Sequence, residues 1–211
     1  MYNHKDLVRR LLRRAGSTYA QEAGIRLRNQ PMPLFQLLVL CLLSDQPTDT
    51  DVAARAAREL FRSGLRTPHT ILATDRGAVL RALARANYRR YDESSATALV
   101  ETAETVQEDY RGDLRLLAER SGRDTRSATT LLKGFSGIGD TGAKIFLREA
   151  QDVWPWARST FDDRALEAAR DLGLPGDATE LGALSLGRNA ELAAALVRYS
   201  DDADVRARLT D

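Results

Sequence analysis

The sequence predicts an all-α fold, and three observations support this prediction. Nearly every segment carries apolar residues at helical spacing, and no run alternates apolar and polar residues for long enough to form a strand. Short turns rich in glycine, proline and aspartate separate the segments. With 211 residues, of which 43% are hydrophobic and 29% charged, the chain can bury a substantial core. We therefore expect a compact bundle of short helices rather than a long coiled coil.

The first helices follow from the pattern of leucines and prolines. Leucines occupy one face of a predicted helix over 6–14, and arginines lie mostly on its other faces. The prolines at 31–33 are expected to break the chain, and a buried helix resumes over 34–43. Thr48 or Asp49 is expected to cap the next helix, whose apolar residues again recur at helical spacing.

The rest of the chain predicts further helices, most of them short. Gly64 and Pro68 separate the first of these from the preceding helix, and Gly112 ends the longest one. The predicted ranges are 69–74, 76–86, 90–110, 114–120, 126–133, 140–150, 162–172 and 189–199. The sequence shows no internal repeat and no low-complexity segment.

The content of cysteine and histidine restricts the metal sites that the chain can form. Cys41 is the only cysteine and lies in the apolar run 37–43, where it is expected to pack as a small hydrophobe. A single cysteine excludes a disulfide within the chain and a zinc or iron–sulfur site held by four cysteines. His4 and His69 are the only histidines, which argues against a His-rich metal site.

Two further features bear on the setting in which the chain acts. The longest apolar run is far too short to cross a bilayer, and no charged-then-apolar leader opens the chain, so we expect a cytoplasmic protein. The formal net charge of +1 leaves nucleic-acid binding open, because a local basic patch can exist within a balanced total. The basic residues are nearly all arginine, and the lysines are Lys5, Lys133 and Lys144.

The stretch FSGIGDTGAKIF, at 135–146, contains three glycines at the start of a predicted helix: Gly137, Gly139 and Gly142. Glycine permits positive φ and allows another backbone or a phosphate to approach closely. The unpaired amides at the start of a helix, together with the helix dipole, form an anion site. The pattern therefore indicates either a phosphate clamp within a helix–hairpin–helix or a tight turn between packed helices. No strand precedes the turn and no GKT or GKS follows it, which argues against a dinucleotide fold or a P-loop.

Four motifs in this order resemble the helix–hairpin–helix base-excision DNA glycosylases, the superfamily that contains endonuclease III (HhH-GPD). They are PLFQLLVLCLLSDQPTD at 33–49, ANYRRYDESSATALV at 86–100, FSGIGDTGA at 135–143 and FDDRALEAARDLGL at 161–174. Each motif is weak alone, and their order and spacing together are fairly specific. The resemblance covers roughly residues 30–175.

The resemblance implies a two-lobed helical bundle with an inter-lobe cleft. The central lobe would cover 33–152 and end in the helix–hairpin–helix at 126–150. The second lobe would combine 1–32 with 153–211. In this family DNA is clamped at the hairpin, and the target nucleotide is flipped into the cleft.

The resemblance also assigns a catalytic carboxylate. Asp162 fills the family's essential position, and Asp163 fills it if the alignment shifts by one residue. An ionised carboxylate near C1′ can stabilise oxocarbenium-like charge and can orient or deprotonate water. The alternative is that Asp162 serves only as the N-cap of its helix, and the two roles can coexist.

Departures from the family pattern narrow the expected activity. Thr141 stands where bifunctional members carry the Schiff-base lysine, and neither Lys133 nor Lys144 matches that position. We therefore expect a monofunctional glycosylase that uses water. The family's four-cysteine iron–sulfur loop is absent, so we expect no such cofactor, although a monovalent cation could bind the hairpin carbonyls.

The resemblance also points to DNA-contacting residues. These are Gln46, Asn87, Tyr88, Arg89, Gly137, Gly139, Thr141 and Gly142. Arg89 is expected to begin a helix near the groove, and Tyr88 would either stack on a base or pack in the core. Trp154 and Trp156 would either line a base pocket or anchor a lobe interface.

Two acidic residues oppose this interpretation and keep other functions open. Asp45 and Asp140 would lie near the presumed phosphate and repel it unless they are paired. The leading hypothesis is a monomeric, nucleoid-associated glycosylase whose partner is lesion-containing double-stranded DNA, with no membrane partner. The alternatives are a non-catalytic DNA-binding protein of the same fold and an all-α interaction scaffold.

Overall fold

The computed structural model describes residues 4–47 and 50–210. Throughout these ranges every regular element is a helix and no β-strand occurs, which confirms the all-α prediction. The chain divides into two compact units, one formed by Met1–Tyr19 with Leu147–Asp211 and the other by Ala20–Phe146. No helix in the described part of the chain is long and apolar enough to cross a membrane.

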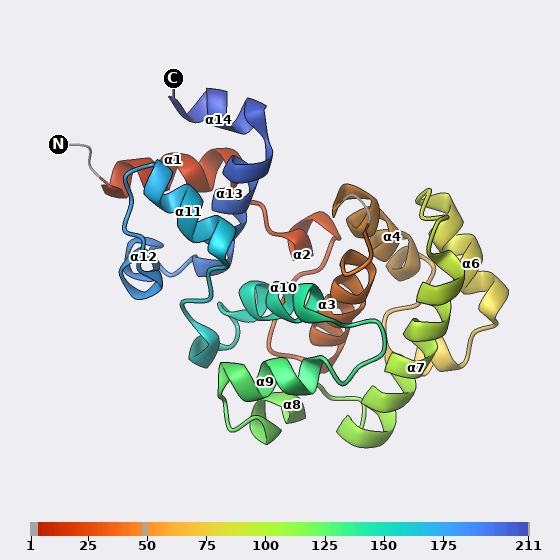
Figure 1. Cartoon of the computed structure of the whole chain (residues 1–211). Coiled ribbons are helices and arrows are strands. Elements are labelled where there is room, and N and C mark those ends of the chain that lie inside the picture. The colour runs from red at the N-terminus through yellow and green to blue at the C-terminus, as the bar shows by residue number, and fades with distance from the viewer. Residues whose placement is uncertain (1–3, 48–49, 211) are drawn as a thin grey trace. The chain divides into compact units, whose positions relative to one another are not determined.

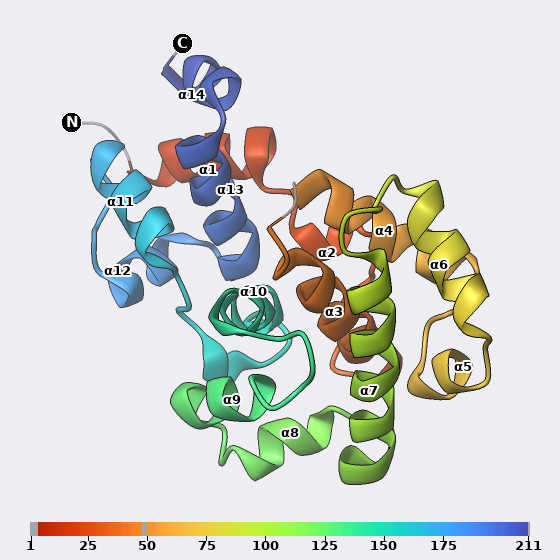
Figure 2. The ribbon, with the colours of Figure 1, turned by 45° about the vertical axis from the view of Figure 1, so that its right-hand side comes forward.

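The unit formed by Ala20–Phe146 is built around one buried helix. Its helices are α3 (Pro31–Ser44), α4 (Thr50–Arg62), α5 (Pro68–Leu72), α6 (Arg76–Arg85), α7 (Asp92–Tyr110), α8 (Arg115–Arg120) and α9 (Thr125–Leu132). Every residue of α3 from Pro33 to Leu43 is buried, which explains why this helix is apolar on all sides. Helices α4 and α7 pack against it (Figure 2).

The other unit joins the N-terminal helix to the C-terminal third of the chain. Its elements are α1 (His4–Ala15), the 3-10 turn η1 (Pro155–Ala157), α11 (Asp163–Asp171), α12 (Ala178–Leu184), α13 (Asn189–Asp201) and α14 (Ala203–Thr210). Helices α1 and α11 both pack on α13 (Figure 1). Their leucines and alanines form one buried cluster, with Leu11, Ala165 and Leu196 fully inaccessible.

Two helices cross the boundaries between these units: α2 (Tyr19–Glu22) and α10 (Asp140–Ala150). The predicted lobes, 33–152 against 1–32 with 153–211, differ from this division at residues 20–32 and 147–152. The physical reason for the first difference is that Ala23 and Ile25 are buried, and the Arg58 guanidinium donates to the Glu22 carbonyl.

Several helix limits differ from the predicted ones. The prolines at 31–33 form the first turn of α3 instead of breaking the chain, because the first turn lacks intrahelical partners for its amides. Helix α7 begins at Asp92, so Arg89 lies in the preceding loop and does not begin a helix. Helices α2, α12 and α14 were not predicted. Thr48 and Asp49 lie outside the described residues.

Candidate nucleic-acid interface and catalytic carboxylate

The predicted helix–hairpin–helix is present. Helix α9 ends at Leu132, a turn follows, and α10 begins at Asp140. Gly137 has φ +76°, a conformation that glycine adopts without strain. A Cβ atom at Gly137 would lie 3.1 Å from side-chain carbons of both Leu42 and Ala98. The turn therefore packs closely against α3 and α7, as the structural alternative predicted.

The amides at the start of α10 bind a carboxylate of the same chain. The Gly139 amide donates to Asp45 Oδ2 at 2.5 Å, and the Gly142 amide donates to Asp45 Oδ1 at 2.8 Å. A Cβ at Gly139 would lie 2.8 Å from Asp45 Oδ2, and a Cβ at Gly142 would lie 3.2 Å from the Cys41 carbonyl oxygen. Two of the three glycines thus allow this carboxylate and the α3 backbone to approach. Asp45 thus occupies amides at the start of a helix, which are groups of the kind that bind anions.

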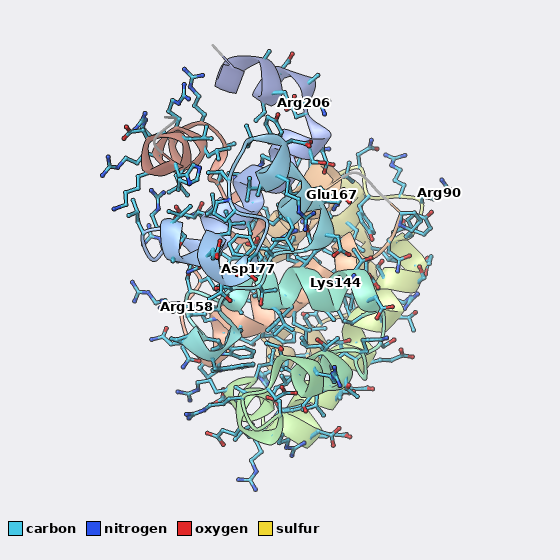
Figure 3. The ribbon with its side chains drawn as sticks, turned by 60° about the vertical axis from the view of Figure 1, so that its left-hand side comes forward. Arg90, Lys144, Arg158, Glu167, Asp177 and Arg206 are labelled. Carbon is cyan, nitrogen blue, oxygen red and sulfur yellow. The ribbon has the colours of Figure 1, made fainter. Side chains whose placement is uncertain are left out.

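Asp140 is also paired. Lys133 Nζ donates to Asp140 Oδ1 at 2.6 Å. This hydrogen bond, with the charge of Lys133, lowers the pKa of Asp140, which is ionised at neutral pH. Thr141 and Lys144 are exposed on the first turns of α10, and Figure 3 labels Lys144 on that helix. Lys133, which directly precedes the turn, is thus bonded to a carboxylate of the same chain.

The residues at 87–89 that were predicted to contact DNA lie in the short loop between α6 and α7. Asn87 has φ +61° and is exposed; asparagine is among the residues that tolerate this left-handed conformation best. Arg89 is exposed, and the Arg90 guanidinium lies over the Tyr91 ring at 5.3 Å (Figure 3 labels Arg90). Gln46 is half-buried just beyond the end of α3. Asn87 and Arg89 are therefore open to solvent, and Gln46 keeps part of its surface exposed.

Tyr88 packs in the core. Its side chain is 2% exposed, and its hydroxyl donates to the Leu43 carbonyl at 3.1 Å and lies 3.2 Å from Ser95 Oγ. Burial raises the pKa of Tyr88, and the Ser95 hydrogen bond opposes this shift only partly. The ring presents no face on which a base could stack. Its environment therefore supports packing in the core rather than stacking on a base.

Asp162 is the N-cap of α11 and is bound to a buried arginine. Its Oδ1 accepts from the Ala165 amide at 2.9 Å, and its Oδ2 accepts from Arg148 Nη1 at 2.9 Å. The Asp162 side chain remains 18% exposed, whereas that of Arg148 is 3% exposed. Asp163 is exposed in the first turn of α11. The carboxylate at 162 is therefore fixed in orientation and still accessible at one edge.

Arg148 connects two carboxylates, a role that its position in the sequence did not indicate. Arg148 Nε lies 4.0 Å from Glu149 Oε1, and the guanidinium lies over the Tyr19 ring at 4.9 Å. Burial by itself would lower the pKa of Arg148, but attraction to Glu149, Tyr19 and Asp162 outweighs burial and raises it. The cluster thus places two carboxyl groups around one buried guanidinium.

The loop that leads to Asp162 is held by a buried glutamine and an aspartate. The Gln151 amide donates to the Thr160 carbonyl at 2.9 Å and accepts from the Thr160 amide at 3.0 Å. Asp152 accepts from the backbone amides of Asn189 at 3.1 Å and Ala190 at 3.0 Å, at the start of α13. Sequence reasoning missed both residues, whose contacts fix the path of the chain up to α11.

The two tryptophans stack on each other. The ring centroids of Trp154 and Trp156 are 5.1 Å apart with an interplanar angle of 24°. Trp154 is 2% exposed and Trp156 is half-buried. Arg158, labelled in Figure 3, is exposed just after η1. Trp154 is thus a core anchor, and only Trp156 retains surface that a ligand could contact.

Comparisons with known proteins can be set beside this geometry. A scan against protein-family models finds no match, and no curated protein matches the sequence. The chain is similar to endonuclease III in a trapped covalent DNA intermediate with an estranged adenine, at 18% identity and TM-score 0.48. It is similar to endonuclease III in a non-covalent DNA complex at 17% identity and the same TM-score. Each comparison covers 94% of this chain and 86% of the other. The all-α class and the helix–hairpin–helix rest on the helices and turns described above.

Proposed function

We propose that the chain is a DNA glycosylase that hydrolyses the N-glycosidic bond of a damaged or mismatched base in double-stranded DNA. The observation that carries this proposal is the Glu149–Arg148–Asp162 cluster, which presents a fixed, partly exposed carboxylate at the start of α11. Asp162 is also the residue that the order of the four motifs assigns to the essential carboxylate.

The cluster suits a reaction in which the sugar gains positive charge. As the base leaves, a carboxylate near C1′ stabilises the oxocarbenium-like transition state. Arg148 bonds to Oδ2 of Asp162, and the Asp162 side chain keeps an exposed edge that a developing cation can approach. Because Arg148 already donates to Oδ2, we propose that Asp162 acts by its charge and by orienting water more than as a strong base.

We further propose that the protein has no efficient lyase activity. Strand cleavage through a Schiff base needs a free amine at the reacting sugar. Thr141 occupies the motif position of that lysine. Lys133 is bonded to Asp140, and Lys144 lies one turn further along α10.

One observation favours a second candidate function, a non-catalytic protein of the same fold. Asp45 occupies two of the hairpin amides, so a DNA phosphate would have to displace it or bind beside it. A carboxylate at this position weakens phosphate binding by repulsion. A chain that retained the architecture and lost lesion excision, or lost DNA binding altogether, would have this arrangement.

A glycosylase assay on duplex oligonucleotides with alkylated, oxidised, deaminated and mismatched bases tests the proposal. We expect release of at least one base, with the strand left intact until alkali or heat cleaves the abasic site. Asp162→Asn should slow release by about 100-fold or more, because the charge that stabilises the transition state is lost. Asp163→Asn, at the exposed neighbouring position, is the matched control and should retain activity.

The outcomes separate the candidates. Loss of activity in Asp163→Asn alone would move the catalytic assignment to that residue. Salt-dependent duplex binding without release of any base would favour the non-catalytic DNA-binding protein. Duplex binding that stays undetectable at low ionic strength would favour the scaffold. Thermal melting of each variant shows whether Asp162→Asn, which leaves Arg148 with one partner fewer, remains folded.

A further inference from the structure

A second candidate site lies within the unit formed by Ala20–Phe146. A cavity of about 470 Å³ opens where the segment after α2 meets the first turns of α3 and the end of α4. This volume falls in the range of pockets that hold small organic ligands. The lining contains Arg26, Arg58, Arg62 and Arg66 and no acidic residue. Such a concentration of one charge points to an anionic ligand.

Most of this positive charge is not neutralised by carboxylates. The Arg58 guanidinium donates to the Glu22 carbonyl, and Arg66 Nε donates to the Phe61 carbonyl at 2.7 Å. These carbonyls hold the side chains in place and carry no net charge. Arg62 pairs with Glu59 at 3.1 Å. Arg26 is exposed and makes no ion pair within residues 4–47 and 50–210.

A buried amide faces the same cavity. Gln36 lines the cavity and is only 8% exposed, near the start of the apolar helix α3. Its amide is not among the fully inaccessible, unpartnered polar atoms of the described residues, so solvent or a ligand in the cavity can reach it. Gln36 therefore offers a donor and an acceptor to whatever occupies the cavity.

This cavity is separate from the hairpin. Gln36 lies near the start of α3, and Asp45 follows its last residue. At 1.5 Å per residue the two positions are about 13 Å apart along the helix axis. The cavity thus lies toward the opposite end of α3 from the amides that Asp45 binds, and its ligand need not be the DNA of the proposed function.

We propose that this cavity binds a nucleoside phosphate. Guanidinium groups bind phosphate oxygens with two parallel hydrogen bonds, and several of them together suit a dianion. The apolar side chains of Met32 and Phe61, which also line the cavity, can contact a planar base, and the Gln36 amide can bond to its polar edge. A ligand with both a phosphate and a base uses all of these features. An acidic peptide would pair with the arginines but would offer no planar base to the Gln36 amide and the apolar side chains.

Calorimetric titration of the full chain with adenosine 5′-monophosphate tests this proposal. We expect saturable binding that weakens with added salt, and at least about tenfold weaker binding of adenosine, which lacks the phosphate. Gln36→Glu removes the amide donor that bonds to the base and adds a negative charge to the cavity, so it should weaken binding by a similar factor. Arg26→Gln should weaken binding several-fold. Arg55→Gln, on the exposed face of α4 and outside the cavity, is the matched control and should bind as the wild type does.

Other results would overturn the proposal. Inorganic phosphate that binds as tightly as the nucleotide would show an anion site without base recognition. Tighter binding of a polyglutamate peptide would assign the cavity to acidic proteins. Competition by duplex DNA would make it a contact for the DNA backbone. Arg26→Gln breaks no ion pair in the described part of the chain, so it keeps the test decisive if Gln36→Glu fails to fold. Base release from lesion-containing duplexes is measured separately, so failure of either proposal leaves the other standing.

Discussion

At the scale of single residues, the sequence allowed both a functional and a structural interpretation of several side chains. The residues around each side chain show which interpretation its environment supports. Asp162 is both a helix cap and a partly exposed carboxylate, so its two readings coexist. Tyr88 is enclosed, and Asn87 beside it is exposed in a left-handed turn. The residue that changes the chemistry most, Arg148, carried no motif and is defined only by its contacts.

Replacing Tyr88 by phenylalanine tests whether this residue is structural. The Leu43 carbonyl and Ser95 lose a partner, so Tyr88→Phe should reduce the free energy of unfolding by about 1 kcal/mol, measured by urea denaturation. Duplex binding should not change, because the ring is buried. A loss of DNA affinity at unchanged stability would return Tyr88 to the interface.

The same variant has a pH signature. The pKa of Tyr88 is raised above 10.0, mainly by burial, so the native state holds this proton more tightly than the unfolded state. The stabilisation that comes from this raised pKa is complete below pH 10.0, and it is lost as the pH rises through the pKa of Tyr88 in the native state. The decline of stability above that pH should be shallower in Tyr88→Phe. It should not vanish, because burial also raises the pKa of Tyr110.

At the scale of elements, the amides at the start of α10 bind a carboxylate of the same chain. Helices α9 and α10, the turn and its glycines were all predicted from the sequence. The spacing of the glycines indicated close approach without saying what approaches. Gly139 and Gly142 receive Asp45, a side chain 94 and 97 residues earlier in the chain.

Removing the Asp45 carboxylate should separate its effect on stability from its effect on DNA affinity. Asp45→Ala leaves the Gly139 and Gly142 amides without their acceptor, which should cost about 1–2 kcal/mol in the free energy of unfolding. If the hairpin contacts DNA, the freed amides should raise duplex affinity and steepen its dependence on salt.

A matched control is available on another helix of the same unit. Asp75 caps α6 by accepting from the Ala78 amide at 2.9 Å. Asp75→Ala should also reduce stability and should leave duplex affinity unchanged. Equal affinity in both variants would mean that the start of α10 does not contact DNA. Fluorescence anisotropy with a labelled duplex, at several salt concentrations, measures the difference.

At the scale of the whole molecule, each unit has a core of its own. The core of the first unit joins α1 to helices more than 140 residues later in the chain: α11 and α13. The core of the second is organised around α3. A cavity made in one core should therefore loosen that unit first.

Leu11→Ala makes such a cavity, because Leu11 is fully buried in α1. We expect a loss of about 2–5 kcal/mol in the free energy of unfolding. Hydrogen exchange should show weaker protection in α1, α11 and α13 before it does in α3 and α7. Leu42→Ala, a fully buried substitution in α3, is the control and should show the reverse order. Uniform loss of protection in both variants would mean that the two units unfold as one.

The sequence by itself determined the helical class, most of the helices, the buried character of α3, the hairpin and the absence of a lysine at Thr141. These features are local, because helical periodicity, turn residues and motif spacing depend on residues that are close together in the sequence. Only the tertiary structure decided that Asp45 occupies the hairpin amides, that Arg148 links Asp162 to Glu149, and that arginines from separate segments meet around Gln36. The physical reason is that charges and hydrogen bonds depend on distance in space. Some of these contacts join residues that are far apart in the chain. Others join sequence neighbours whose interaction depends on their burial. Neither kind can be predicted from a local sequence pattern.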